Sequence, residues 1–236
     1  MERIYLHGAG LNADSWGAVP GRALNLPGHG GRPRAARATA ACFADAIEAE
    51  VPRGAALIGY SLGGMVAMAF AAARPGYLGA LVLVDTPIRA PLKFISWYTP
   101  FVAPVVTRVP GLKAIGKTVG SRIENLEGRA TFRRHIEAAH PSGMADALCV
   151  AGSYDGERDL PKLSLPTLVL CGARSLLTGD TYRALVARTA PQATIVEMDT
   201  GHHIPFDDPT GMERNIAQFL DGPAFSKENA GSTPGT

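Results

Sequence analysis

Cysteine is scarce in this chain. Cys42, Cys149 and Cys171 are the only three among 236 residues, and they are widely spaced. An odd, scattered set is typical of neither a disulfide framework nor a metal site. We therefore expect three reduced, mostly buried thiols in a cytoplasmic protein, with no bound metal or organic cofactor.

Long apolar runs and a strong charge of one sign are also missing. No segment reaches the roughly 20 apolar residues of a membrane-spanning helix, and no export signal precedes the first apolar segment. A net charge of +2 argues against a protein built as a whole to bind nucleic acid. The apolar content of 46% excludes disorder over most of the length and suffices for one domain with a sizeable core.

Short apolar segments alternate with helical patterns along the chain. Buried strands are predicted at 4–6, 23–26, 55–59, 81–84, 167–171 and 194–198, and helices at 39–50, 62–73, 181–189 and 212–220. Such alternation predicts an α/β fold with a mostly parallel sheet and helices on both faces. The functional loops then lie at the carboxyl ends of the strands.

The region 87–159 interrupts this alternation, because it lacks strand patterns and holds several prolines. Its aromatic residues Phe94, Trp97, Tyr98 and Phe101 follow the spacing of one helical face. We expect 87–159 to be a helical cap inserted into a core formed by 1–86 and 160–221. The stretch 222–236 has the composition of a disordered tail.

A Gly-x-Ser-x-Gly pattern, Gly59-Tyr60-Ser61-Leu62-Gly63, falls between a predicted strand and a predicted helix. A serine on so sharp a turn needs small neighbours two residues away, so that strand and helix can approach each other. The turn also places Ser61 at the amino end of the helix, where developing negative charge is stabilised.

Several further segments accompany this turn. These are His7-Gly8-Ala9-Gly10, Leu26-Pro27-Gly28-His29-Gly30 and Gly201-His202-His203, which follow the first, second and last predicted strands. Together with 59–64 they resemble the α/β-hydrolase family over residues 4 to 220. The resemblance implies that Ser61 is a nucleophile and His202 its general base, and that the backbone amides of Ala9 and Leu62 form an oxyanion hole. It also implies structural roles for His7 and His29, and it favours His202 over the adjacent His203.

The acid that would orient the histidine departs from the family pattern. The strand at 167–171 is normally followed by Gly, two residues and Asp, but here the fourth position is Ser175. Asp85 ends the strand at 81–84, at the correct edge of the sheet. Asp180 is a second candidate, although its context fits a helix N-cap. Asp199 lies too near His202 in sequence to fold back onto its ring, and a Ser–His dyad without an acid is the remaining alternative.

The resulting hypothesis is a serine hydrolase that cleaves a carboxylic ester or thioester of a small acyl substrate. Amide or carbon–carbon hydrolysis, and a ligand-binding protein without catalysis, are alternatives. Residues 89–134 contain nine basic and two acidic residues, a local net charge of +7. This charge could attract an anionic substrate, or it could belong to the solvated outer face of the cap. The sequence leaves the acyl length and the oligomeric state undefined.

Overall fold

A computed structural model describes residues 1–89 and 109–222. Its six strands form one sheet in the order β2-β1-β3-β4-β5-β6, and every neighbouring pair is parallel. The strands are β1 (Arg3–Leu6), β2 (Arg22–Leu24), β3 (Ala56–Tyr60), β4 (Ala80–Val84), β5 (Thr167–Gly172) and β6 (Ala193–Met198). All six were predicted, with ends within two residues of those observed, so the expected α/β architecture is confirmed.

The four predicted core helices are also present. The helices and short 3-10 turns of the core are η1 (Ala13–Trp16), α1 (Ala40–Ile47), η2 (Glu48–Glu50), α2 (Leu62–Ala73), α7 (Asp180–Thr189), α8 (Ile204–Asp207) and α9 (Pro209–Leu220). Helix α1 begins after Thr39, whose side chain accepts a hydrogen bond from the amide of Cys42 at 3.2 Å. The suggestion that Asp180 is an N-cap is wrong, because Gly179 holds that position and Asp180 is the first helical residue.

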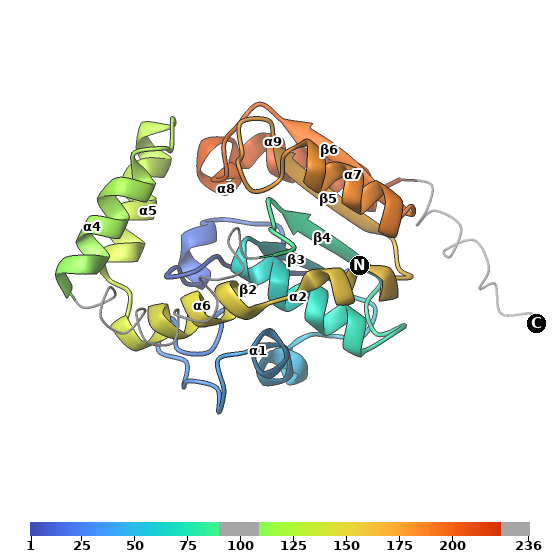
Figure 1. The fold of residues 1–236 in the computed structure, drawn as a ribbon, viewed down its shortest axis with the longest axis horizontal. Helices are drawn as coiled ribbons and strands as arrows, with labels where there is room; N and C mark the ends of the chain where they lie inside the picture. The colour runs from blue at the N-terminus through green and yellow to red at the C-terminus, as the bar shows by residue number, and fades with distance from the viewer. Residues whose placement is uncertain (90–108, 223–236) are drawn as a thin grey trace, which may run out of the picture.

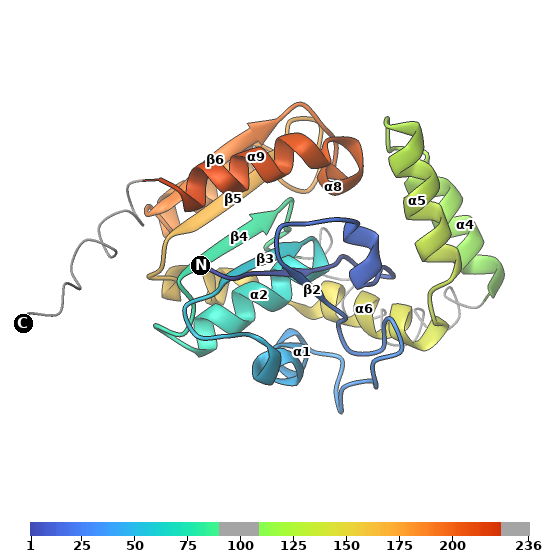
Figure 2. The same ribbon diagram turned by 180° about the vertical axis from the view of Figure 1, so that it is seen from behind.

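Helices cover both faces of the sheet because strand side chains alternate between them (Figures 1 and 2). Ile4 and Leu6 of β1 belong to the apolar cluster shared with α1, α2 and α7. Tyr5, between them, belongs to the cluster on the other face, together with residues of α9 such as Ile216. Strands buried on both faces explain the nearly continuous apolar runs in the sequence.

The described part of the segment between β4 and β5 is mostly helical. It contains α4 (Val109–Gly120), α5 (Leu126–Glu137), α6 (Pro141–Ser153), η3 (Gly156–Arg158) and η4 (Leu160–Lys162). Helices α4 and α5 stand beyond one end of the sheet, whereas α6 runs beside α2 (Figures 1 and 2). The aromatic group Phe94–Phe101 lies outside the described residues, and so does the expected tail except for Gly222.

Two expectations from composition bear on the fold. The three cysteines are all free, but only Cys171 is fully buried, while Cys42 and Cys149 are partly exposed. No helix in the described ranges is both long and apolar enough to cross a membrane.

Candidate active site

The loops that carry the candidate residues meet at one edge of the sheet. Leu6 pairs with Gly59, Tyr60 with Val84, and Gly172 with Met198, so the last residues of five strands lie close to one another across the sheet. The next residues along the chain are the ones singled out in the sequence. The order of strands changes direction at β1 and β3, which is where open α/β sheets place their ligands.

Ser61 occupies a strained turn between β3 and α2. Its φ of 52° and ψ of −112° lie outside the regions that residues other than glycine normally adopt. The flanking glycines make this turn sterically feasible. A Cβ atom on Gly59 would lie 2.4 Å from the backbone of Gly63, and one on Gly63 would lie 2.1 Å from the carbonyl oxygen of Leu6.

The structure brings His202 and Asp85 together. His202 Nδ1 lies 2.6 Å from Oδ2 of Asp85, in a hydrogen bond between loops that follow β6 and β4. The Asp85 carboxylate is fully buried, whereas the His202 side chain retains 23% of its exposure. Because Nδ1–H of His202 donates this hydrogen bond to Asp85, the free lone pair of a neutral His202 is on Nε2, the nitrogen that faces away from the acid.

The other candidate acids are directed elsewhere. Asp180 forms an ion pair with Arg183 on the surface, where its side chain is 98% exposed. Asp199 pairs with Arg174 and is equally peripheral. Neither carboxylate contacts His202, so of the three acids considered only Asp85 reaches the ring.

His202 and His203 point in different directions, as expected for neighbours on a loop. His203 Nδ1 is hydrogen-bonded to the Tyr60 hydroxyl at 2.7 Å, and its ring packs on Phe132 at 4.9 Å between centroids. Burial is the main cause, and the neighbouring His202 the second, that lowers the pKa of His203 to about 3. A neutral, internally bonded imidazole of this kind supports the loop and faces the core.

His7 and His29 tie the loops after β1 and β2 to each other. His7 Nε2 accepts from the Leu26 amide at 3.0 Å, and its Nδ1 donates to the carbonyl of Gly8 at 2.8 Å. His29 Nε2 accepts from the Gly10 amide at 3.3 Å, and its Nδ1 donates to the carbonyl of Pro27. In both rings, both nitrogens therefore form hydrogen bonds to the backbone of the loops after β1 and β2. This is a structural role.

The amides of Ala9 and Leu62 are available as donors. Leu62 is the first residue of α2, where amides have no partner within the helix. In the part of the chain that the structure describes, neither amide donates to a protein acceptor. In the described residues, the Ser61 hydroxyl and His202 are not hydrogen-bonded to each other. Such catalytic hydrogen bonds often form only when substrate binds.

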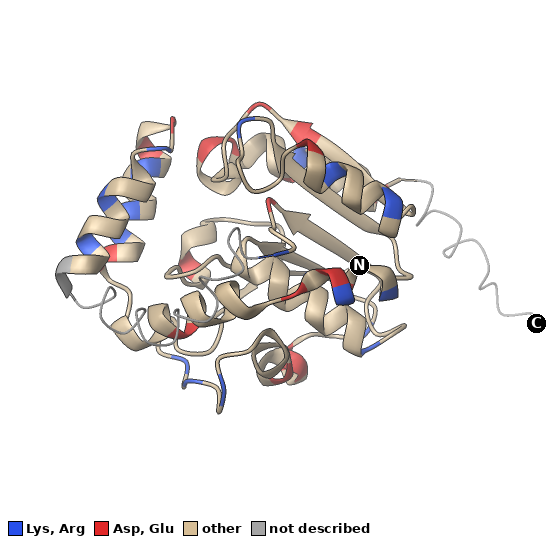
Figure 3. Cartoon of the chain, viewed as in Figure 1, with Lys and Arg blue, Asp and Glu red and all other residues tan. Residues whose placement is uncertain are grey.

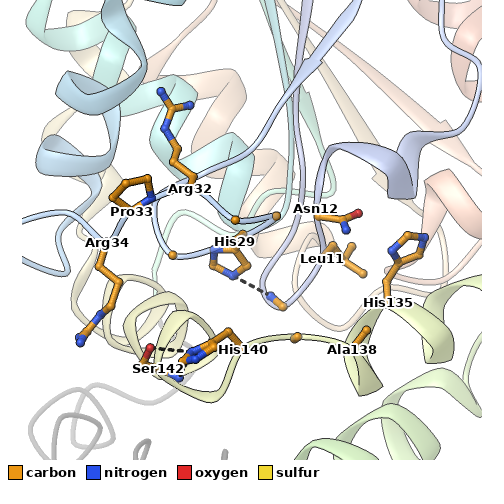
Figure 4. Close-up of a pocket in the computed structure, with 15 residues that line it drawn as sticks. Leu11, Asn12, His29, Arg32, Pro33, Arg34, His135, Ala138, His140 and Ser142 are labelled. Carbon is orange, nitrogen blue, oxygen red and sulfur yellow. Dashed lines mark hydrogen bonds between the residues drawn. The ribbon is translucent and has the colours of Figure 1, made fainter.

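A cavity of about 420 Å³ lies between the core and the helices α5 and α6 (Figure 4). Its wall includes Gly10 and Leu11, next to Ala9, and His135 on α5. The guanidinium groups of Arg32 and Arg34 point away from His29 (Figure 4). They form ion pairs with Glu50 and Asp146. The rest of the wall is mixed, with glycine backbone, a few apolar side chains and the polar side chains of three histidines, an asparagine and a serine. Ser61, Asp85 and His202 are not among its lining residues.

Sequence reasoning missed the residues that surround Asp85. Its Oδ1 accepts hydrogen bonds from the Gly172 amide at 2.7 Å and from the Thr178 hydroxyl, while the Ser175 hydroxyl donates to Oδ2 at 2.7 Å. In the sequence, Ser175 stands out only as a departure from the family pattern. Within residues 1–89 and 109–222 no three histidine, cysteine, aspartate or glutamate side chains form a group that could hold a metal ion.

Known proteins agree with this architecture. The chain matches the model of the Alpha/beta hydrolase family over residues 4–214. It is 35% identical to Esterase Rv0045c of Mycobacterium tuberculosis, across 92% of this chain and 82% of that protein. It is 27% identical to the pimeloyl-[acyl-carrier protein] methyl ester esterase of Aromatoleum aromaticum, across 86% of this chain and 91% of that protein.

A solved structure is similar over nearly the same extent. The malate-bound thermophilic esterase from Thermogutta terrifontis superimposes with a TM-score of 0.80 and 28% identity, covering 93% of this chain and 89% of that one. The chain belongs to the α/β-hydrolase family. The named relatives further identify it as a carboxylic ester hydrolase, and they do not favour the ligand-binding alternative.

Proposed function

We propose that this ester hydrolase works through Ser61 as nucleophile, His202 as general base and Asp85 as the acid that orients His202. The observation that carries the proposal is the hydrogen bond of 2.6 Å between His202 and the buried Asp85, at the sheet edge where the strained Ser61 turn lies. A serine hydroxyl needs a base to become nucleophilic, and a histidine needs a partner to fix its ring and tautomer. The three residues supply these functions in the chain order Ser, Asp, His.

In this mechanism, Nε2 of His202 takes the proton from Ser61 Oγ as that oxygen forms a bond to the ester carbonyl carbon. The carbonyl oxygen becomes an oxyanion, for which the amides of Ala9 and Leu62 are the proposed donors. His202 then gives the proton to the leaving alcohol, and the C–O bond of the ester breaks. Water hydrolyses the acyl-enzyme with His202 again acting as base.

The negative charge of Asp85 is most useful when His202 becomes positive. A fully buried carboxylate has no competing water, so its attraction for the imidazolium is strong compared with that of a surface pair. Asp85 also selects the tautomer with the proton on Nδ1, because Nδ1–H donates a hydrogen bond to its carboxylate and Nε2 is then left free to accept a proton. Both effects lower the barrier to proton removal from Ser61.

The substrate is proposed to be a small acyl ester that enters between the core and the cap, with 87–159 as the cap over 1–86 and 160–221. The cavity of about 420 Å³ beside Gly10 is within the usual size for small ligands and is proposed to receive one end of the ester.

An anionic group on the substrate is proposed to be attracted by the charge of α4 and α5 (Figure 3). Lys113, Lys117, Arg122 and Arg134 are exposed there, and among the described residues none of them has an ion-pair partner. A field of this kind raises the local concentration of a negatively charged ester without direct contact. The advantage of a carboxylated ester over a neutral one should fall as salt is raised from about 0.01 M to 1 M.

The test of the nucleophile is turnover of p-nitrophenyl esters of increasing acyl length by wild type and Ser61→Ala. Labelling with a fluorophosphonate, read by peptide mass spectrometry, gives a second measurement. We expect turnover and label to disappear together in Ser61→Ala, whereas the matched control Ser153→Ala, on the exposed end of α6, keeps both. Undiminished turnover by folded Ser61→Ala, or a label on another residue, would rule out the proposed mechanism.

A further inference from the structure

The loop between β5 and α7 closes around the Asp85 carboxylate. Ser175 and Thr178 on this loop both direct their hydroxyl groups at it, and both are buried, with exposures of 7% and 0%. Asp85 also receives the Gly172 amide and His202 Nδ1. Two donors thus meet each carboxylate oxygen, which fills its hydrogen-bonding capacity.

The direction of the Ser175 hydroxyl is fixed by its second hydrogen bond. Its Oγ accepts from the amide of Leu177 at 3.2 Å. The hydroxyl proton therefore points at Oδ2 of Asp85, 2.7 Å away. This is the same oxygen that His202 contacts, so Ser175 and His202 approach one atom from different sides.

The Thr178 hydroxyl and the Gly172 amide hold the opposite oxygen, Oδ1. A carboxylate bound at one oxygen only can rotate about its Cβ–Cγ bond, since this torsion is broad in aspartate. Donors at both oxygens remove that freedom. The plane of the group is then fixed with Oδ2 toward His202.

We propose that Ser175 and Thr178 are positioning residues of this hydrolase, whose hydroxyl groups fix the plane of the Asp85 carboxylate and through it the orientation of the His202 ring. The inference rests on the roles proposed above for Asp85 and His202. Neither hydroxyl touches substrate, because both are turned into the protein around a fully buried acid. They act on the rate of the chemical step and leave substrate binding unchanged.

The kinetic test uses Ser175→Ala, Thr178→Val and the double variant, with turnover of one p-nitrophenyl ester at several concentrations. We expect each single variant to lose about tenfold in kcat and the double variant more, with KM within about twofold of wild type, since misplacing a catalytic group by a fraction of an ångström is costly. Thr178→Ser restores the hydroxyl and should recover most of kcat. Ser153→Ala removes a serine hydroxyl far from Asp85 and should leave kcat unchanged.

A second measurement separates positioning from a general loss of stability. In an Asp85→Ala background the two hydroxyls have no carboxylate to hold, so adding Ser175→Ala should cost less than about twofold further. The low-field proton NMR resonance of His202 Nδ1–H should broaden or move in Ser175→Ala and remain in place in Ser153→Ala. Circular dichroism checks that each variant is folded.

The inference is wrong if the folded double variant keeps wild-type kcat, if only KM changes, or if Ser175→Ala costs as much without Asp85 as with it. These results would leave the proposed function standing, provided that Ser61→Ala still abolishes turnover and labelling. Loss of the proposed function has a different signature, namely turnover that persists in Ser61→Ala.

Discussion

The carboxylate of Asp85 and the imidazole of His202 are 117 positions apart in the chain and are joined by a hydrogen bond of 2.6 Å. They meet because β4 and β6 lie on either side of β5 in a parallel sheet, and each residue follows the carboxyl end of its strand. Asp85 itself has a φ of +40°, an uncommon value for a residue other than glycine. Strained backbone at two positions of one site, Ser61 and Asp85, is typical of functional geometry.

Replacing the acid provides the most direct test of this relationship. Asp85→Asn should lower kcat by roughly 10³- to 10⁴-fold with a small change in KM, because an amide neither stabilises an imidazolium nor selects the correct tautomer. Steady-state turnover of a p-nitrophenyl ester at several concentrations measures both kcat and KM. The control Asp180→Asn changes an exposed surface acid and should behave as wild type. If kcat fell equally in Asp85→Asn and Asp180→Asn, the assignment of Asp85 as the acid would be wrong.

The turn at Ser61 predicts a large effect of one methyl group. In Gly63→Ala the new Cβ would lie 2.1 Å from the carbonyl oxygen of Leu6, which is backbone of the central sheet and has no room to move. We expect at least about 3 kcal/mol of destabilisation, measured by urea unfolding, or failure to fold. Gly116→Ala, in α4, is the matched control because its Cβ would make an ordinary contact of 3.4 Å with Ile136. A stable Gly63→Ala protein would contradict this account of the turn.

The strands, the helices and the turn at Ser61 could be predicted from the sequence more fully than the surroundings of Asp85. Buried parallel strands are apolar on both faces, so each appears as a short run such as 81–84, and the order of strands and helices follows. The elbow at Ser61 carries its own local signal in Gly59 and Gly63. These features depend on neighbours in sequence, which is why a single sequence contains them.

The choice of acid and its surroundings depend on contacts between distant segments. Three aspartates followed plausible elements. The strand-end position of Asp85 favoured it over Asp180, but only the placement of His202 beside it in space identifies it as the partner. The hydroxyl of Ser175 reaches Asp85 only because β5 lies beside β4, and Thr178 gave no signal at all before the loop was placed. Helix α8 was missed because it is four residues long and directly follows the histidine loop.

The buried histidines predict that stability falls at mildly acid pH. Burial lowers the pKa of both His7 and His203 from 6.5 to about 3. At a pH between 3 and 6.5, these two histidines are therefore protonated in the unfolded chain and neutral in the folded protein. The free energy of unfolding therefore decreases as pH falls below about 6.5, by about 2 kcal/mol per histidine at pH 5.

Urea unfolding at pH 7.5 and pH 5.0 measures this effect. His203→Gln removes one of the two groups while keeping a polar partner for Tyr60, so its unfolding free energy should depend less on pH than that of wild type. Wild-type stability that is constant from pH 7.5 to pH 5.0 would contradict neutral burial of these rings.

The start of α5 is hydrogen-bonded to α8, the helix that follows the loop carrying His202 and His203. Oδ1 of Asp207, at the end of α8, accepts hydrogen bonds from the amides of Glu124 and Asn125 at 2.7 and 3.3 Å. Gly128 passes so close to α8 that a Cβ there would lie 2.0 Å from the Phe206 carbonyl oxygen. The start of α5 thus contacts α8, the helix that directly follows the loop carrying His202.

Removing this acceptor should release the two amides. In Asp207→Ala we expect faster hydrogen exchange at Glu124 and Asn125, and a loss of about 1 kcal/mol in unfolding free energy. Asp207→Asn keeps a carbonyl oxygen for the same amides and should preserve most of their protection, which separates the hydrogen bonds from the charge. If both amides already exchange in wild type as fast as in Asp207→Ala, the contact does not restrain α5. Protection in wild type that is lost only in Asp207→Ala would instead show that Asp207 of α8 restrains the start of α5.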